Sequence, residues 1–194
     1  MKRREPKSRG NRKGQNQNLT PTYSDLVSEY LAEPDPNDTC CSASMSPHEA
    51  IDAAGKCLMC PIKESNIHSH QYRIRKTALR ELHIVLTKNA KQICAATDFD
   101  ELYLLIKKLT SKIKGIGDLT VYDTAHRIGL SLKKLPGSVY LHCGALMGAI
   151  AVLGSVPSRR LPVTAFPAAF HRLQADQMEN FLCIYKKMLA ECRQ

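Results

Sequence analysis

The chain has 194 residues, 43% of them hydrophobic, with no tryptophan and a net charge of +10. This composition excludes a wholly disordered chain, argues against many β-sandwich folds, and offers no apolar run long enough for a membrane-spanning helix. The basic N-terminus has no apolar segment behind it, so we expect no secretory signal. The cysteines should therefore be reduced, and the protein should lie in the cytoplasm, or in the nucleoid or nucleus if it binds DNA.

Residues 1–39 are predicted to form a flexible arm with two oppositely charged halves. Residues 1–19 contain seven basic residues and one acid, whereas residues 20–39 contain five acids and no base. The basic half is rich in Gly, Asn, Gln and Ser and lacks apolar periodicity, which is typical of disorder. It should attract a polyanion such as nucleic acid, or else fold over the acidic half. Within the acidic half, residues 23–31 could form a short helix.

Residues 40–194 carry apolar residues at helical spacing and predict a single compact all-α domain, a helical bundle with no convincing strand. The first helix should begin at residues 46–49, which combine a capping box with a proline in the first turn. Gly144 and Gly148 should let a neighbouring helix approach closely. The further predicted helices span residues 71–95, 98–113, 119–132, 138–153 and 176–192, with an irregular segment at 159–167.

The most informative stretch joins two of these helices, with a hairpin at residues 114–118. Gly115 and Gly117 allow a tight reversal, and the Ile116 between them can pack between the helices. The helix that follows should present free N–H groups and the positive end of its dipole, which suits a backbone phosphate. The predicted nucleic-acid-binding residues are Lys112, Lys114, Gly115, Ile116, Gly117 and Thr120.

This stretch resembles the helix-hairpin-helix motif of DNA-binding proteins, whose hairpin has the pattern apolar-x-Gly-apolar-Gly-x-x-Thr-Ala. Val121 takes the place of the small alanine. The resemblance implies largely sequence-independent binding of double-stranded DNA through its phosphate backbone, without a cofactor or a membrane. A tight helix–helix turn that binds nothing would have the same spacing. The residues that match the pattern are Ile113, Lys114, Gly115, Ile116, Gly117 and Thr120.

Asp118 could close this anion site. It follows Gly117 directly, and as an N-cap its carboxylate would accept hydrogen bonds from the same N–H groups that a phosphate needs. Its charge would also repel a phosphate. The position of Asp118 relative to the N–H groups of residues 117–120 therefore decides whether the site is open or filled.

The order of the helices also resembles the scaffold of the helix-hairpin-helix DNA glycosylase superfamily. By position, the catalytic lysine of that superfamily falls on Leu119, and its catalytic aspartate falls at His142 or a neighbour. Leucine cannot form a Schiff base, and residues 139–143 offer no carboxylate to stabilise a developing cation. The resemblance therefore implies a glycosylase-like scaffold that binds DNA without excising a base.

Two other functions stay open. An enzyme could use a polar pocket around Asp123, Arg127 and His142, with His142 as a general base and His70 as a further candidate. Asp123 and Arg127 lie four residues apart, however, and would equally form an ion pair on one helix face. A helical module that binds another protein is the third hypothesis.

The sequence raises one hypothesis of a metal site, which is a zinc site. Cys57 and Cys60 form a C-x-x-C pair, and His68 and His70 follow it. The spacing is shorter than in common zinc fingers, and Cys57 falls on the apolar stripe of its predicted helix. Core cysteines followed by a polar loop are the simpler interpretation.

Overall fold

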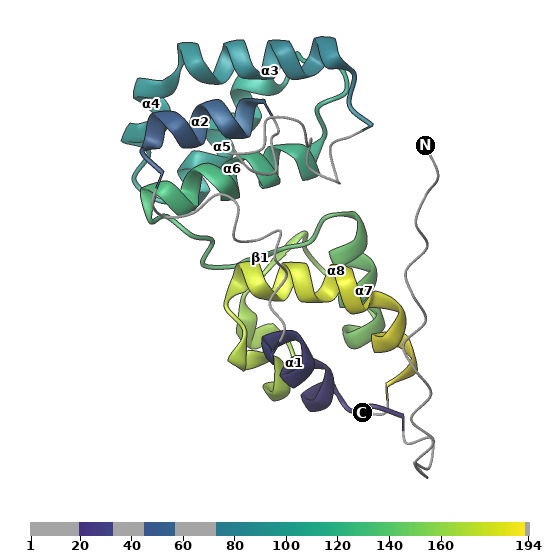
Figure 1. Cartoon of the computed structure of the whole chain (residues 1–194). Helices are drawn as coiled ribbons and strands as arrows, with labels where there is room; N and C mark the ends of the chain where they lie inside the picture. Colours follow the sequence, from purple (N-terminus) through teal and green to yellow (C-terminus); the bar gives the residue numbers. More distant parts are fainter. Residues whose placement is uncertain (1–19, 33–44, 57–72, 193–194) are drawn as a thin grey trace, which may run out of the picture.

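The computed structural model describes residues 20–32, 45–56 and 73–192, which are mostly helical, as predicted (Figure 1). No helix in these ranges is long and apolar enough to cross a membrane. Strands β1 (Val139–Tyr140) and β2 (Arg160–Leu161) form an antiparallel pair, and two short 3₁₀ helices, η1 (Val163–Ala165) and η2 (Ala168–Arg172), follow them. The α-helices are α1 (Tyr23–Ala32), α2 (Pro47–Gly55), α3 (Lys76–Lys88), α4 (Ala90–Ala95), α5 (Phe99–Thr110), α6 (Asp118–Leu132), α7 (Cys143–Leu153) and α8 (Ala175–Glu191).

The buried side chains form two hydrophobic clusters, and Figure 1 shows the helices in two corresponding groups. The first lobe comprises α2 to α6, with Leu102 among its fully buried side chains, and the second lobe comprises α1, α7, α8 and the 3₁₀ helices, with Phe181 at its centre. Strand β1 contributes to both lobes, since Tyr140 belongs to the first cluster and Val139 to the second. Successive side chains of a strand point to opposite faces, so this short strand joins the two cores.

Two helices begin where their sequence signals place them. At α2, the Ser46 hydroxyl accepts a hydrogen bond from the Glu49 N–H, while the Glu49 carboxylate accepts one from the Ser46 N–H. At α5, the Asp98 carboxylate accepts from the Glu101 N–H at 2.8 Å. Both side chains satisfy N–H groups that a helix leaves unpaired in its first turn.

Two predicted helices differ from the structure. The helix predicted over residues 71–95 is divided into α3 and α4 at Asn89, whose side-chain amide donates to the Val85 carbonyl at 2.8 Å. The helix predicted over residues 138–153 begins only at Cys143, because the residues before it form β1. The prediction that the chain has no strand was therefore wrong: a β-strand and a fully buried helical turn are equally apolar in sequence.

Helix α1 corrects the predicted extent of the arm. The sequence predicted a flexible arm over residues 1–39 with a possible short helix at residues 23–31. The structure confirms that helix as α1, but α1 buries Leu26 and Val27 completely in the second lobe. The Tyr23 ring lies 5.1 Å from that of Phe170, centroid to centroid. The apolar spacing of α1 outweighs its acidic composition, since burying such a stripe stabilises a helix that would not persist alone. The basic half of the arm, residues 1–19, lies outside the described residues.

The two glycines of α7 allow α7 and α8 to pack closely, as predicted. A Cβ atom at Gly148 would collide with the backbone carbonyl of Leu182, and one at Gly144 would collide with the Cys183 side chain. The carbonyl belongs to helix backbone and cannot rotate away, so Gly148 is the more demanding position.

We therefore expect Gly148→Ala to lower the free energy of unfolding by about 1–3 kcal/mol, because the added methyl group forces α7 and α8 apart. Urea denaturation followed by circular dichroism measures this change. Gly137→Ala is the matched control, since a Cβ atom there meets nothing within 4 Å. Equal stability of the two variants would contradict the close packing of α7 on α8.

Candidate nucleic-acid interface

The chain reverses direction between α5 and α6 within residues 111–117. The Ile113 N–H donates to the Thr110 carbonyl at 2.9 Å, and the Ile116 N–H donates to the Ile113 carbonyl at 3.2 Å. Gly115 has a φ of 102°, a conformation that residues with a side chain rarely adopt. Ile116 packs against the core of the first lobe, as the sequence predicted for the residue between two glycines.

The outer edge of this turn faces solvent. Lys112 and Lys114 are exposed, and so are Gly115 and Gly117. A Cβ atom at either glycine would meet nothing within 4 Å, so another molecule could approach the backbone there. Thr120, the last residue of the predicted set, is buried and lies away from this exposed edge.

The N-terminus of α6 has no side-chain cap. Gly117 is the N-cap residue, and its carbonyl accepts the first helical hydrogen bond from Val121 at 3.0 Å. Asp118 is the first residue of the helix, and its carboxylate lies 3.0 Å from the Lys107 ammonium group of α5. Within the described residues no side chain bonds the first-turn N–H groups of α6, so Asp118 does not fill the anion site.

The ion pair between Lys107 and Asp118 sets the charge at this helix end. Both side chains are about half exposed, at 49% and 62%. The hydrogen bond that Lys107 donates to Asp118, together with the nearby Tyr103, raises the pKa of Lys107, so the ammonium group stays charged. Such an exposed pair adds little stability, but it offsets the negative charge of Asp118 beside the turn.

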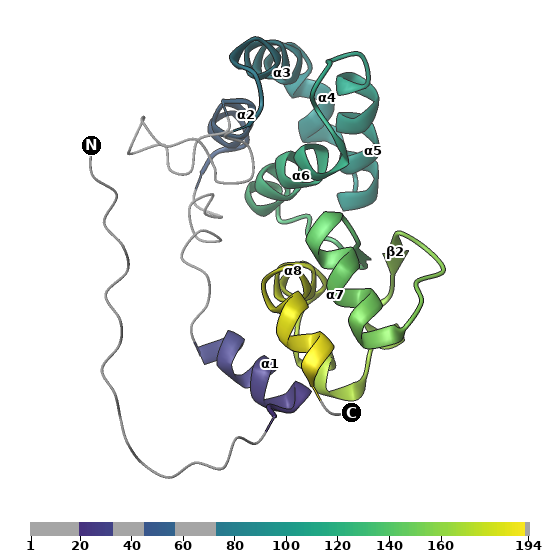
Figure 2. The same ribbon diagram turned by 90° about the vertical axis from the view of Figure 1, so that its right-hand side faces the viewer.

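A pocket of about 590 Å³ opens next to this helix end, where the two lobes meet. Figure 2 shows the elements around it, with α6 above α7 and β2 beside α7. Leu119 and His142, the two positions that the glycosylase resemblance identifies, both line the pocket. The charged and polar side chains of the lining include Lys107, Asp118, His142, Cys143, Arg159 and Arg160.

His142 is the N-cap residue of α7 and makes no side-chain cap bond. Its Nε2 atom is buried and has no hydrogen-bond partner among the described residues. Burial lowers the pKa of His142, although the charges of Asp118 and Asp123 oppose that shift, so the ring is neutral at pH 7. The Tyr122 ring packs beside it, with the ring centroids 5.2 Å apart.

The other candidates for a polar pocket lie elsewhere. Asp123 and Arg127 are both on α6, half-buried and buried, and both already take part in interactions within the protein. Neither lines the 590 Å³ pocket, so the structure brings only His142 of these three residues to it. His70 and the zinc candidates Cys57, Cys60 and His68 lie outside the described residues. In the described part of the chain, no group of three or more metal-binding side chains gathers.

Sequence reasoning missed the arginines of this pocket. Arg159 and Arg160 lie at β2, in a segment that the sequence predicted to be irregular. Asp100 of α5 fixes this region. Its carboxylate accepts a hydrogen bond from the Tyr140 hydroxyl and forms an ion pair with Arg160, both at 2.6 Å. Val139 and Tyr140 are residue types that favour strands, but a strand of two residues is too short to recognise from sequence.

A second polar contact joins the lobes. His126 of α6 and Asp176 of α8 lie 3.2 Å apart, and each side chain is less than one-fifth exposed. Burial raises the pKa of Asp176, but the hydrogen bond and charge of His126, together with the backbone N–H groups of Asp176 and Gln177, lower it by more, so the net shift is downward. The carboxylate is therefore more stable in the folded protein than in the unfolded chain.

We accordingly expect Asp176 to contribute to acid sensitivity. Its folded pKa lies below the unfolded value of about 3.9, so its stabilisation is present above about pH 4 and is lost as the pH falls through the lower folded value. Asp176→Asn should flatten the fall in unfolding free energy below pH 4, measured by urea denaturation. Glu81→Gln, at an exposed position of α3, is the control. An unchanged acid profile in Asp176→Asn would rule this contribution out.

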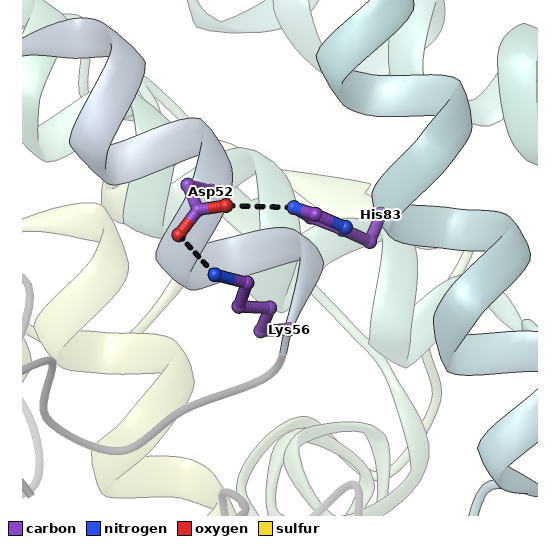
Figure 3. Close-up of polar contacts among 3 residues, drawn as sticks. All are labelled: Asp52, Lys56 and His83. Atoms are coloured by element: carbon purple, nitrogen blue, oxygen red, sulfur yellow. Dashed lines mark hydrogen bonds and ion pairs between the residues drawn. The ribbon is translucent and has the colours of Figure 1, made fainter. Parts of the chain in front are cut away.

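The first lobe holds a further polar cluster away from the pocket (Figure 3). Asp52 of α2 accepts a hydrogen bond from Lys56 at 2.8 Å and lies 2.7 Å from His83 Nε2 of α3. Burial raises the pKa of Asp52, but its two partners lower it by more. This cluster links α2 to α3, and its residues do not line the pocket.

No known protein family, curated protein or solved structure matches the chain.

Proposed function

We propose that this protein binds the phosphate backbone of double-stranded DNA through the turn between α5 and α6, as a helix-hairpin-helix, without reading base sequence and without catalysis. The observation that carries the proposal is the uncapped N-terminus of α6 beside the exposed Lys112 and Lys114. A phosphate oxygen could accept hydrogen bonds from the free N–H groups there, where the helix dipole also favours negative charge.

The surroundings of the turn support a backbone contact. The open space over Gly115 and Gly117 lets a phosphate reach the N–H groups without displacing a side chain. Residues 107–134 contain seven basic residues and two acids, so this part of the chain attracts a polyanion. The basic residues 1–19 would add further affinity by releasing counterions from the DNA.

The two alternative functions have less support. An enzyme built on Asp123, Arg127 and His142 would need all three side chains in one pocket, and only His142 lines the pocket described above. A helical module for another protein has no observation that favours it, and it becomes the preferred hypothesis if the protein does not bind DNA at low salt.

The direct test is the double variant Lys112→Gln/Lys114→Gln. We expect it to bind several unrelated duplexes more weakly by the same factor, and to reduce the slope of log affinity against log salt concentration by about 2. Fluorescence anisotropy with labelled duplexes measures both. Lys88→Gln/Lys91→Gln, two exposed lysines of α3 and α4, is the matched control. The same affinity loss in both double variants, or no loss in the first, would reject the turn as the interface.

Asp118→Asn tests the electrostatics of the same site in the opposite direction. Removing the carboxylate eliminates its repulsion of a phosphate and releases Lys107 from the ion pair. Duplex affinity should rise several-fold at low salt, or by about 1 kcal/mol, and the gain should shrink as salt screens the charges. Glu81→Gln changes the net charge equally and serves as the control. Weaker binding by Asp118→Asn would contradict an open phosphate site.

A further inference from the structure

We propose that the pocket between the two lobes binds a nucleotide through its terminal phosphate. The ligand would be a free nucleoside monophosphate or the phosphorylated end of a nucleic-acid strand, which share this chemistry. The pocket lies beside the turn but faces the junction of α6, α7 and β2. The pocket and the duplex contact share the N-terminus of α6, whereas Arg159 and the start of α7 belong to the pocket alone.

The size of the pocket suits such a ligand. Its volume of about 590 Å³ lies within the range of about 300–1,000 Å³ that is typical of small-molecule sites. The lining also includes the side chains of Tyr103 and Leu104, and Leu104 is 61% exposed. An inorganic phosphate would leave these two side chains uncovered, whereas the base of a nucleotide could pack against them.

Arg159 is the cation in the pocket lining that could bind a phosphate without first breaking an ion pair. The other two cations in the lining are already paired, Lys107 with Asp118 and Arg160 with Asp100. The Arg159 side chain is exposed, and no residue that the structure describes pairs with its guanidinium group. Its backbone is held in place, because the Arg159 carbonyl accepts a hydrogen bond from the Leu141 N–H at 2.8 Å. An arginine fork binds a phosphate through two parallel hydrogen bonds.

Two helices begin at this pocket, which adds to its preference for an anion. Both N-cap residues, Gly117 of α6 and His142 of α7, line it, and neither makes a side-chain cap bond.

Calorimetric titration of the full chain with adenosine 5′-monophosphate tests the proposal. We expect binding at least tenfold tighter than that of adenosine, and tighter than that of inorganic phosphate. Arg159→Gln should weaken nucleotide binding about tenfold, while Arg80→Gln, at an exposed position of α3, should leave it unchanged. Equal binding of adenosine and its monophosphate, or no effect of Arg159→Gln, would overturn the proposal.

Cys143 offers a second readout that locates the ligand. Its side chain lines the pocket and is exposed, whereas Cys192 is only partly exposed and lies at the end of α8, outside the pocket lining. A bound nucleotide should slow the alkylation of Cys143 by iodoacetamide several-fold and leave that of Cys192 unchanged, as measured by peptide mass spectrometry. Equal alkylation of Cys143 with and without saturating nucleotide would place the ligand elsewhere.

Competition with short duplexes in Lys112→Gln/Lys114→Gln, whose duplex contact at the turn is weakened, distinguishes the two sources of the phosphate. Displacement of the nucleotide by a 5′-phosphorylated duplex, but not by its 5′-hydroxyl counterpart, assigns the pocket to a strand end, and displacement by neither assigns it to a free nucleotide. Equal displacement by both would contradict recognition of a terminal phosphate. Lys112→Gln/Lys114→Gln should keep its nucleotide affinity within twofold. An incorrect duplex proposal and an incorrect nucleotide proposal can therefore be told apart, because the first is tested by duplex affinity and the second by nucleotide affinity.

Discussion

The reversal between α5 and α6 depends on a backbone conformation that only glycine adopts easily, the φ of 102° at Gly115. With that conformation the chain needs only residues 111–117 to turn, and Ile116 closes the inner side of the turn against the first core. The helix that follows begins at a second glycine, which has no side chain to occupy its free N–H groups. Asp118, the nearest group that could occupy them, pairs with Lys107 instead. The proposal that this end of the molecule binds an anion rests on these constraints.

A second feature of the structure is the junction where the two lobes meet. Strand β1 places Tyr140 in the first core and Val139 in the second, and Asp100 ties this junction to α5 through Tyr140 and Arg160. The junction also brings the start of α7 near the start of α6, and the pocket lies between them. Neither lobe contains this pocket alone. The proposed site for the phosphate of a nucleotide thus depends on how the lobes join, whereas the proposed duplex contact belongs to the first lobe.

The sequence predicted those features that local chemistry controls. The capping box at Ser46 and the aspartate cap at Asp98 mark true helix starts, because these hydrogen bonds form within four residues. The turn could be located for the same reason, since two glycines and an intervening isoleucine act locally. Features that depend on distant partners were not predicted. These are the packing of α1 into the second core, the Lys107–Asp118 pair, and the presence of Arg159 and His142 in one pocket, which arise only when the chain is folded.

The central claim is that a phosphate reaches the N–H groups at the start of α6. Amide chemical-shift mapping by nuclear magnetic resonance tests it most directly, with a short duplex titrated into the isotope-labelled protein at low salt. The account predicts that the backbone amides of residues 115–120 shift more than those of any other described segment, and that added salt reverses the change. Binding that shifts other segments and leaves these amides unmoved would contradict it.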